Sequence, residues 1–129
     1  MLQLVDQFTG NAFVIIVNKQ TIIDASVPSH IQEAFESFKN SDEKEDFAKI
    51  GTTIYFFVKE NEDLERMRVA GFNIRQKLDK KTIGITVAGN NETALALAEG
   101  LALSNYQFLK YFKDADDREY ALEHIYLLG

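Results

Sequence analysis

Short apolar runs alternate with longer amphipathic stretches along most of the chain. The runs AFVIIV, TIYFFV and TIGITVA, at residues 12–17, 53–58 and 82–88, are rich in β-branched and aromatic residues and have the length of strands. LQLV near the start and EHIYLLG at the end predict two further strands. Because the run at 53–58 is apolar at nearly every position, we expect both of its faces to be covered.

Three longer stretches carry apolar residues every three or four positions, which is the spacing of one helix face. The first covers residues 29–39, and a capping box that starts at Ser29 is predicted to begin it. The second covers residues 61–81, with Asn61 as the expected cap. The third follows Gly89. Its buried stripe is expected to contain Ala94, Leu97, Ala98, Leu101 and Ala102.

Two of the predicted helices contain a glycine, Gly71 in the second and Gly100 in the third. A glycine inside a helix costs about 1 kcal/mol relative to alanine, so we expect each to let its helix lie close on a sheet. Strands that alternate with helices predict an α/β fold built in layers. The pair Asn18-Lys19 predicts a tight hairpin, and the polar residues 40–51 predict a loop or a short helical turn.

The chain has the size of one domain. Its 129 residues are 46% hydrophobic and 26% charged, which is typical of a globular protein. No apolar run reaches the roughly 18 residues that a membrane-spanning helix needs, and the start does not have the pattern of a secretory signal. The absence of cysteine excludes disulfides and thiolate chemistry. We therefore expect a soluble, cytoplasmic chain that does not contact a membrane.

The charge of the chain disfavours nucleic acid as a partner. The net charge is −6, so a polyanion would be repelled over most of the surface. The basic residues of the second predicted helix and its exit are expected to form a solvated face. These residues are Arg66, Arg68, Arg75, Lys77, Lys80 and Lys81.

Side chains suited to catalysis are sparse. His30 and His124 are the two histidines, and neither belongs to a nucleophile motif. Three acidic clusters, at residues 42–46, 60–65 and 114–117, are expected to be solvated surface. The last of them does not fit the spacing of a calcium loop. We predict no catalytic, cofactor-binding or metal-binding residue in this chain.

One turn has the form of an anion site. Gly89, Asn90 and Asn91 join a predicted strand to a predicted helix, an arrangement that presents backbone N–H groups to a phosphate. The turn has one glycine where a dinucleotide fingerprint has three, and no P-loop lysine follows it. A plain connection between strand and helix is therefore favoured over a nucleotide site.

Residues 94–112, ALALAEGLALSNYQFLKYF, form the most distinctive segment. We expect the helix to give way to a polar Ser-Asn turn, followed by aromatic residues that anchor the chain before its last strand. These aromatic residues are Tyr106, Phe108, Tyr111 and Phe112. The segment resembles the one that closes the N-terminal domain of the cytosol (leucyl) aminopeptidases. The matching residues are Glu99, Gly100, Leu101, Leu103, Tyr106, Phe108 and Lys110.

The resemblance covers about residues 53–128, and it implies that residues 1–129 are a single non-catalytic N-terminal domain. That domain is a three-layer α/β/α sandwich with a mixed sheet, similar to macro domains. In the family, the catalytic residues and two divalent metal ions, zinc or manganese, belong to a C-terminal domain that these residues do not contain. The implied parent is a metalloaminopeptidase that releases N-terminal amino acids. The implied partners are its own catalytic domain and, in a hexamer, further copies.

An alternative reading needs no second domain. In it, the chain is a stand-alone macro-like module that binds a nucleotide or ADP-ribose at residues 89–91. In both readings, the terminal run YLLG is the last strand of the domain, and in the first it marks the border with the missing catalytic part.

Overall fold

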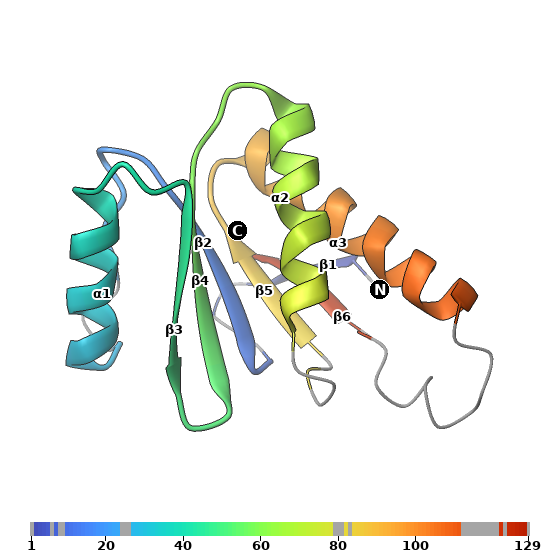
Figure 1. The fold of residues 1–129 in the computed structure, drawn as a ribbon, viewed down its shortest axis with the longest axis horizontal. Helices are drawn as coiled ribbons and strands as arrows, with labels where there is room; N and C mark the ends of the chain where they lie inside the picture. Colours follow the sequence, from blue (N-terminus) through green and yellow to red (C-terminus); the bar gives the residue numbers. More distant parts are fainter. Residues whose placement is uncertain are drawn as a thin grey trace.

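The structure of the chain is an α/β fold. The computed structural model describes residues 2–5, 7, 10–23, 27–78, 82, 84–111, 122 and 124–128, and for Leu2 and residues 107–111 only the backbone. In this part of the chain, six strands form one mixed sheet between layers of helices (Figure 1). The α/β fold predicted from the sequence is confirmed, and its layers are consistent with an α/β/α sandwich.

The elements follow one another as two strands, a helix, a β-hairpin, and then helices and strands in alternation. Their bounds are β1 (Leu2–Val5), β2 (Ala12–Val17), α1 (Ser29–Lys39), β3 (Glu45–Ile50), β4 (Thr53–Lys59), α2 (Leu64–Lys77), β5 (Gly84–Ala88), α3 (Asn91–Tyr111) and β6 (His124–Leu128). The order across the sheet is β1-β6-β5-β2-β4-β3. Neighbouring strands run parallel except β3, which is antiparallel to β4.

The sheet separates two hydrophobic cores. Helix α1 covers one face, and α2 with α3 covers the other (Figure 1). Along β2, Phe13 and Ile15 belong to the core under α1, while Val14 and Ile16 belong to the core under α2 and α3. All six residues of this strand are buried. The two strands with continuous apolar runs, β2 and β4, therefore have helices over both of their faces. This is what the apolar run at residues 53–58 predicted for β4.

The predicted hairpin at Asn18-Lys19 is wrong. Asn18 does make a turn, in which its Oδ1 accepts hydrogen bonds from Gln20 N at 2.9 Å and from Thr21 Oγ1 at 3.0 Å. The residues that follow, 21–23, are not a strand, and β2 pairs in parallel with β4 and β5 instead. A central parallel strand has both neighbours supplied by distant segments, which a local turn signal cannot reveal.

Residues 40–51 also differ from the prediction, because they contain strand β3. This strand pairs with β4 through a two-residue turn, where Gly51 has a φ of 58° that favours glycine. β3 lies at one edge of the sheet, and most of its side chains are exposed. Its strand conformation comes from pairing with β4, so the mixed polar sequence gave little sign of it.

Both predicted helix caps are displaced. Helix α1 begins at Ser29, so Pro28 takes the cap position and no side chain caps the helix, while Gln32 Nε2 donates to Val27 O at 2.6 Å. Helix α2 is capped by Asp63, whose Oδ1 accepts a hydrogen bond from Glu65 N at 3.0 Å. Asn61 accepts one from Asp63 N just before the helix. The helices themselves lie where the apolar spacing predicted them.

The glycines of α2 and α3 serve a helix crossing, and the expected contact with the sheet is wrong. A methyl group on Gly71 would collide with the carbonyl oxygen of Leu97 in α3, and one on Gly100 would collide with that of Arg68 in α2. The two glycines thus lie over each other's helix backbone. Helices that meet at such a point are closer than their side chains would otherwise allow.

This crossing predicts the effect of adding one carbon. Gly71→Ala and Gly100→Ala are each expected to lower the free energy of unfolding by about 1–3 kcal/mol, the usual cost of overpacking, although alanine favours a helix by about 1 kcal/mol. The measurement is urea denaturation of each variant.

The double variant provides the control. Because either methyl group forces the same two helices apart, the second substitution should cost less than it does alone. Stabilisation by the single substitutions, or costs that add fully in the double variant, would contradict a shared crossing point.

Candidate functional site

Residues 94–111 of the segment that resembles the aminopeptidases lie within one long helix. Helix α3 continues to Tyr111, so the predicted polar turn at Ser104 and Asn105 is wrong. Leu101 is buried under the sheet, while Leu103 and Tyr106 are exposed. Phe108 lies in the helix, but its side chain and the whole of Phe112 are outside the described residues.

Asn105 explains why a polar pair occurs in the middle of this helix. The residue is buried, and its Oδ1 accepts hydrogen bonds from Leu122 N and from Arg75 Nε, both at 3.0 Å. Its Nδ2 donates to Leu122 O at 2.9 Å. One side chain therefore joins α3 to α2 and to the segment that leads into β6. The sequence signal was its position, four residues after buried Leu101, where the apolar spacing calls for a buried residue.

Arg75 corrects the expectation of a solvated basic face on α2. Its side chain is buried against Asn105, and burial lowers the pKa of its guanidinium below the ordinary value. Arg66 and Arg68 remain at the surface, while Lys80 and Lys81 lie outside the described residues. The basic residues of this region therefore do not form one continuous patch.

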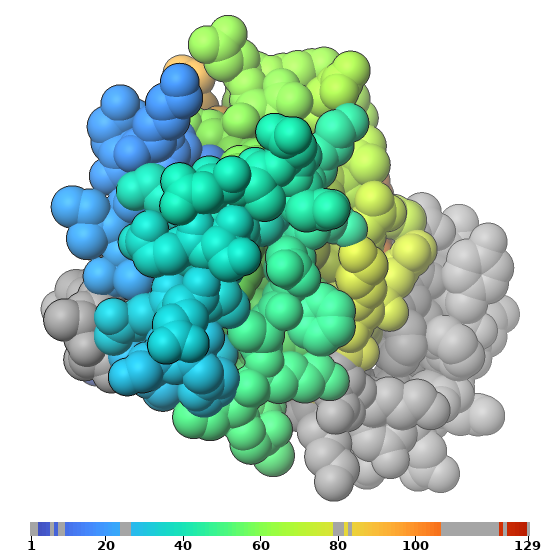
Figure 2. Space-filling model, turned by 60° about the vertical axis from the view of Figure 1, so that its left-hand side comes forward, coloured from blue at the N-terminus to red at the C-terminus, as the bar shows by residue number. Residues whose placement is uncertain are grey.

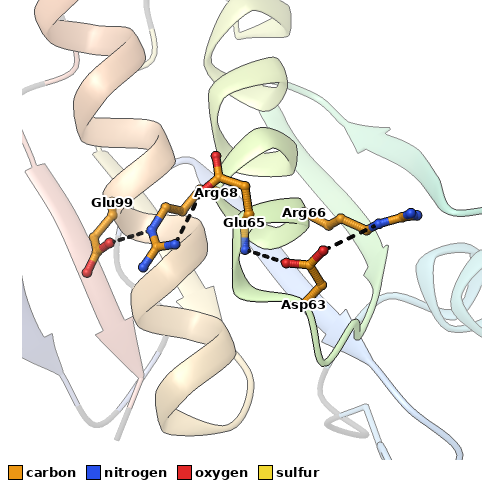
Figure 3. Close-up of polar contacts among 5 residues, drawn as sticks. All are labelled: Asp63, Glu65, Arg66, Arg68 and Glu99. Atoms are coloured by element: carbon orange, nitrogen blue, oxygen red, sulfur yellow. Dashed lines mark hydrogen bonds and ion pairs between the residues drawn. The ribbon is translucent and has the colours of Figure 1, made fainter.

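Glu99, a residue of the motif, forms an ion pair beside the helix crossing. Arg68 Nε donates to Glu99 Oε2 at 2.8 Å, and Arg68 Nη1 lies 3.4 Å from Glu65 Oε2 (Figure 3). The hydrogen bond with Glu99 raises the pKa of the Arg68 guanidinium. These side chains are partly exposed, so water and salt weaken the pair. Its role is to hold α2 and α3 together, with no reacting group nearby.

A cleft opens at the carboxyl ends of the parallel strands. β2 leads to α1 on one face and the adjacent β5 leads to α3 on the other (Figure 1). In open parallel sheets, ligands bind at such a reversal. The cleft has a volume of about 400 Å³, and Gly89 and Asn90 line it, together with Ile15, Ile16, Asn18, Gln20, Thr21, Ile22, Ile23, Ala88 and Leu128. None of these described residues is charged.

The N-terminus of α3 is capped by the preceding residue, which accepts hydrogen bonds from two N–H groups of the first turn. Asn90 is its cap: Oδ1 accepts from Thr93 N at 3.0 Å, and the backbone oxygen accepts from Ala94 N at 2.9 Å. The Asn90 amide donates in turn to the carboxylate of Glu60, which also accepts from Asn18 Nδ2 at 2.9 Å. Glu60 thus places a negative charge beside the predicted anion turn at residues 89–91, which disfavours a phosphate there.

Packing against β2 explains why a glycine occupies position 89. A side chain at this position would approach the side chain of Ile16 to 2.9 Å, so the turn must pass close to β2. Asn91 is exposed at the start of α3 and does not line the cleft. Of the three residues predicted as an anion site, the structure therefore brings two to the cleft.

The two histidines are exposed and lie on different elements. His30 is exposed on α1, and His124 is exposed on β6, where its ring stacks on Tyr126. Across the described ranges, no group of three or more histidine and acidic side chains is placed to hold a metal ion. The acidic cluster at 114–117 lies outside those ranges. No helix in the part of the chain that the structure describes could cross a lipid bilayer.

Comparison with known proteins gives a likeness in fold. No protein-family model matches the chain, and neither does any curated protein sequence. Among solved structures, a mutant of tomato leucine aminopeptidase has a similar fold, with a TM-score of 0.61 and 12% sequence identity. The match covers 99% of this chain and 32% of the aminopeptidase chain. This chain therefore corresponds to about a third of the aminopeptidase, and the likeness includes the first fifty residues.

The buried amide of Asn105 yields the prediction from this region. Asn105→Ala is expected to lower the free energy of unfolding by at least about 2 kcal/mol, because each buried polar group that loses its partner costs roughly 1–3 kcal/mol. Thermal and urea denaturation of the isolated chain measure the loss.

The neighbouring Tyr106→Ala is the matched control. Its side chain is 62% exposed, so its removal should change stability by no more than about 0.5 kcal/mol. Equal effects of the two substitutions would show that Asn105 does not join the three segments.

Proposed function

We propose that this chain is a non-catalytic N-terminal domain of a leucyl-aminopeptidase-like enzyme, and that it supports a separate catalytic domain. The observation that carries the proposal is the extent of the structural likeness. Nearly the whole chain, 99%, superposes on a third of an aminopeptidase, which leaves most of that enzyme unmatched. The resemblance of residues 94–112 to the segment that ends this domain in the family supports the same assignment.

The chemistry of the described residues agrees with a supporting role. The motif residues Glu99, Gly100 and Leu101 serve the contact of α3 with α2 and with the sheet. In the proposal, the two divalent metal ions, zinc or manganese, and the hydrolysis of N-terminal residues belong to the catalytic domain. The complete protein would be a cytoplasmic homohexamer.

The outer face of α3 offers a surface for the catalytic domain. Leu95, Leu103 and Tyr106 are 41%, 55% and 62% exposed. With Glu99 they follow a spacing of three and four residues, which aligns them along one side of the helix. Three of these four, Glu99, Leu103 and Tyr106, are motif residues, and all three are exposed in this chain. Large apolar side chains aligned on a surface typically mark a protein contact.

A second candidate is a macro-like module for a nucleotide or ADP-ribose. The position of the cleft, at the reversal between β2 and β5, supports it. The charges oppose it, because the described lining is uncharged and Glu60 lies beside the turn. The role as a supporting domain is therefore favoured over nucleotide binding.

The first proposal predicts a larger parent protein. An antibody raised against this chain should detect, in a lysate of the source organism, a band several times heavier than 14.7 kDa. The precipitated protein should release leucine from an aminoacyl amide when manganese or zinc is present, whereas the 129-residue chain alone should not.

Substitutions on the outer face of α3 supply the control. In the precipitated protein, Leu103→Asp with Tyr106→Asp should reduce turnover, while Val69→Asp, at an exposed apolar residue of α2, should leave it unchanged. A band at 14.7 kDa, or metal-dependent turnover by the isolated chain, would contradict the proposal.

The second candidate is tested by titration calorimetry of the chain with ADP-ribose. We expect no binding heat at millimolar ligand, because a pyrophosphate at the turn would approach the Glu60 carboxylate and the described lining of the cleft is uncharged. Saturable heat that Glu60→Gln strengthens would favour the nucleotide reading over the supporting role.

A further inference from the structure

Strand β3 is one of the two edge strands of the described sheet, the other being β1, and its backbone hydrogen-bonding groups alternate in direction. The carbonyl oxygen of Lys44 accepts from Lys59 N in β4 at 2.9 Å, so the backbone groups of residue 44 point toward β4. In an antiparallel pair this direction alternates along the strand. The N–H and C=O groups of Glu45, Phe47 and Lys49 therefore point away from the sheet, toward the free edge.

The same three residues share a face of the sheet. Their partners in β4 are Val58, Phe56 and Ile54, which belong to the core under α2 and α3. Helix α2 does not cover β3 itself: Phe47 is 54% exposed, and a hollow of about 160 Å³ lies between the strand and the helix. In Figure 2, the teal to green segment that contains β3 lies at the surface of the face shown.

We propose that β3 pairs with β3 of a second copy of this chain, in antiparallel orientation about a two-fold axis at Phe47. Such an axis keeps both copies of a given residue on the same face of the joined sheet. It places Glu45 opposite Lys49 of the second copy, Phe47 opposite Phe47, and Lys49 opposite Glu45. These are the residues whose backbone groups point toward the edge where the new ladder would form.

Charge complementarity favours a second copy of this chain as the partner of the β3 edge. A lysine on an edge strand normally discourages pairing, but in this register each Lys49 faces a carboxylate. Opposite charges and aromatic pairs directly across a strand pair are favourable, and like charges are unfavourable. A shift of the register by two residues in one direction would place Lys49 opposite Phe47 and lose both charge pairs. A shift in the other direction would place Lys49 opposite Glu43, which lies before the strand and whose backbone groups already bond to Ser41 and Lys59.

Two local interactions must adapt to this pairing. Phe47 N donates to Asp46 Oδ1 at 2.8 Å, and this hydrogen bond must be exchanged for one to the second copy. Glu45 already forms an ion pair with Lys77 of α2, so in the dimer its carboxylate lies between two lysines. The inference goes beyond the proposed function, because it concerns the 129-residue chain and needs no catalytic domain.

The test is the mass of the chain in solution, measured by sedimentation equilibrium over a concentration series. We expect a reversible dimer of twice 14.7 kDa. Lys49→Glu should weaken dimerisation about tenfold, because symmetry creates two like-charge pairs. Glu45→Lys combined with Lys49→Glu should restore the dimer. Lys19→Glu, which changes the net charge equally at an exposed turn, should leave it unchanged.

Lys49→Pro keeps the test decisive if the charge-swapped variant does not fold. It removes an N–H that only the dimer uses, so a folded monomer by circular dichroism is the expected result. A wild-type monomer at every concentration, a dimer that Lys49→Glu and Lys49→Pro leave intact, or open-ended assembly through a different strand would each overturn the proposal.

Discussion

The close crossing of α2 and α3 sets the geometry on which the rest of the domain depends. At Gly71 and Gly100 each helix lies against the backbone of the other, so the pair covers one face of the sheet as a single layer. This proximity brings Arg75 and Asn105 together in the interior. Through Asn105, the layer also holds Leu122, directly before β6. The insertion of the last strand between β1 and β5 is thus tied to a contact between two helices.

The layers also decide where a ligand could enter. Because α1 and α3 leave the sheet on opposite faces, a cleft forms at the carboxyl ends of β2 and β5. Its described lining is uncharged, and the neighbouring polar groups are used within the protein, as Asn18, Glu60 and Asn90 bind one another. The features that distinguish this domain lie instead on its surface, on the outer side of α3 and along β3. Both are suited to contacts with other polypeptides.

Those two surfaces differ in chemistry. The outer side of α3 is apolar around Leu103 and Tyr106, and such a surface favours a stable contact with a partner that covers it. The edge of β3 is self-complementary, with Glu45 and Lys49 placed symmetrically about Phe47. Because the surfaces lie on different elements, a catalytic domain on α3 would leave the β3 edge to a second copy. Support of an enzyme and self-association are therefore compatible roles for one domain.

The sequence by itself determined most strands, all three helices and the layered class of the fold, because apolar spacing is a local property. Residues 54–58 of β4 are apolar and buried, and the predicted helix at residues 29–39 buries Ile31, Phe35 and Phe38 against the sheet. It also identified Gly71 and Gly100 as points of close approach. What it could not specify was the partner of each glycine, since that depends on which surfaces meet after folding.

Only the tertiary structure decided the remaining features. β3 is a strand because β4 supplies its hydrogen bonds, and Asn105 continues a helix because Leu122 and Arg75 satisfy its amide. In isolation, a polar residue after a helix predicts a turn, since its side chain competes for backbone groups nearby. The predicted anion site is likewise a capped helix end, because Asn90 bonds to Thr93 and to the distant Glu60. Partners distant in sequence decide these positions, so a local pattern cannot predict them.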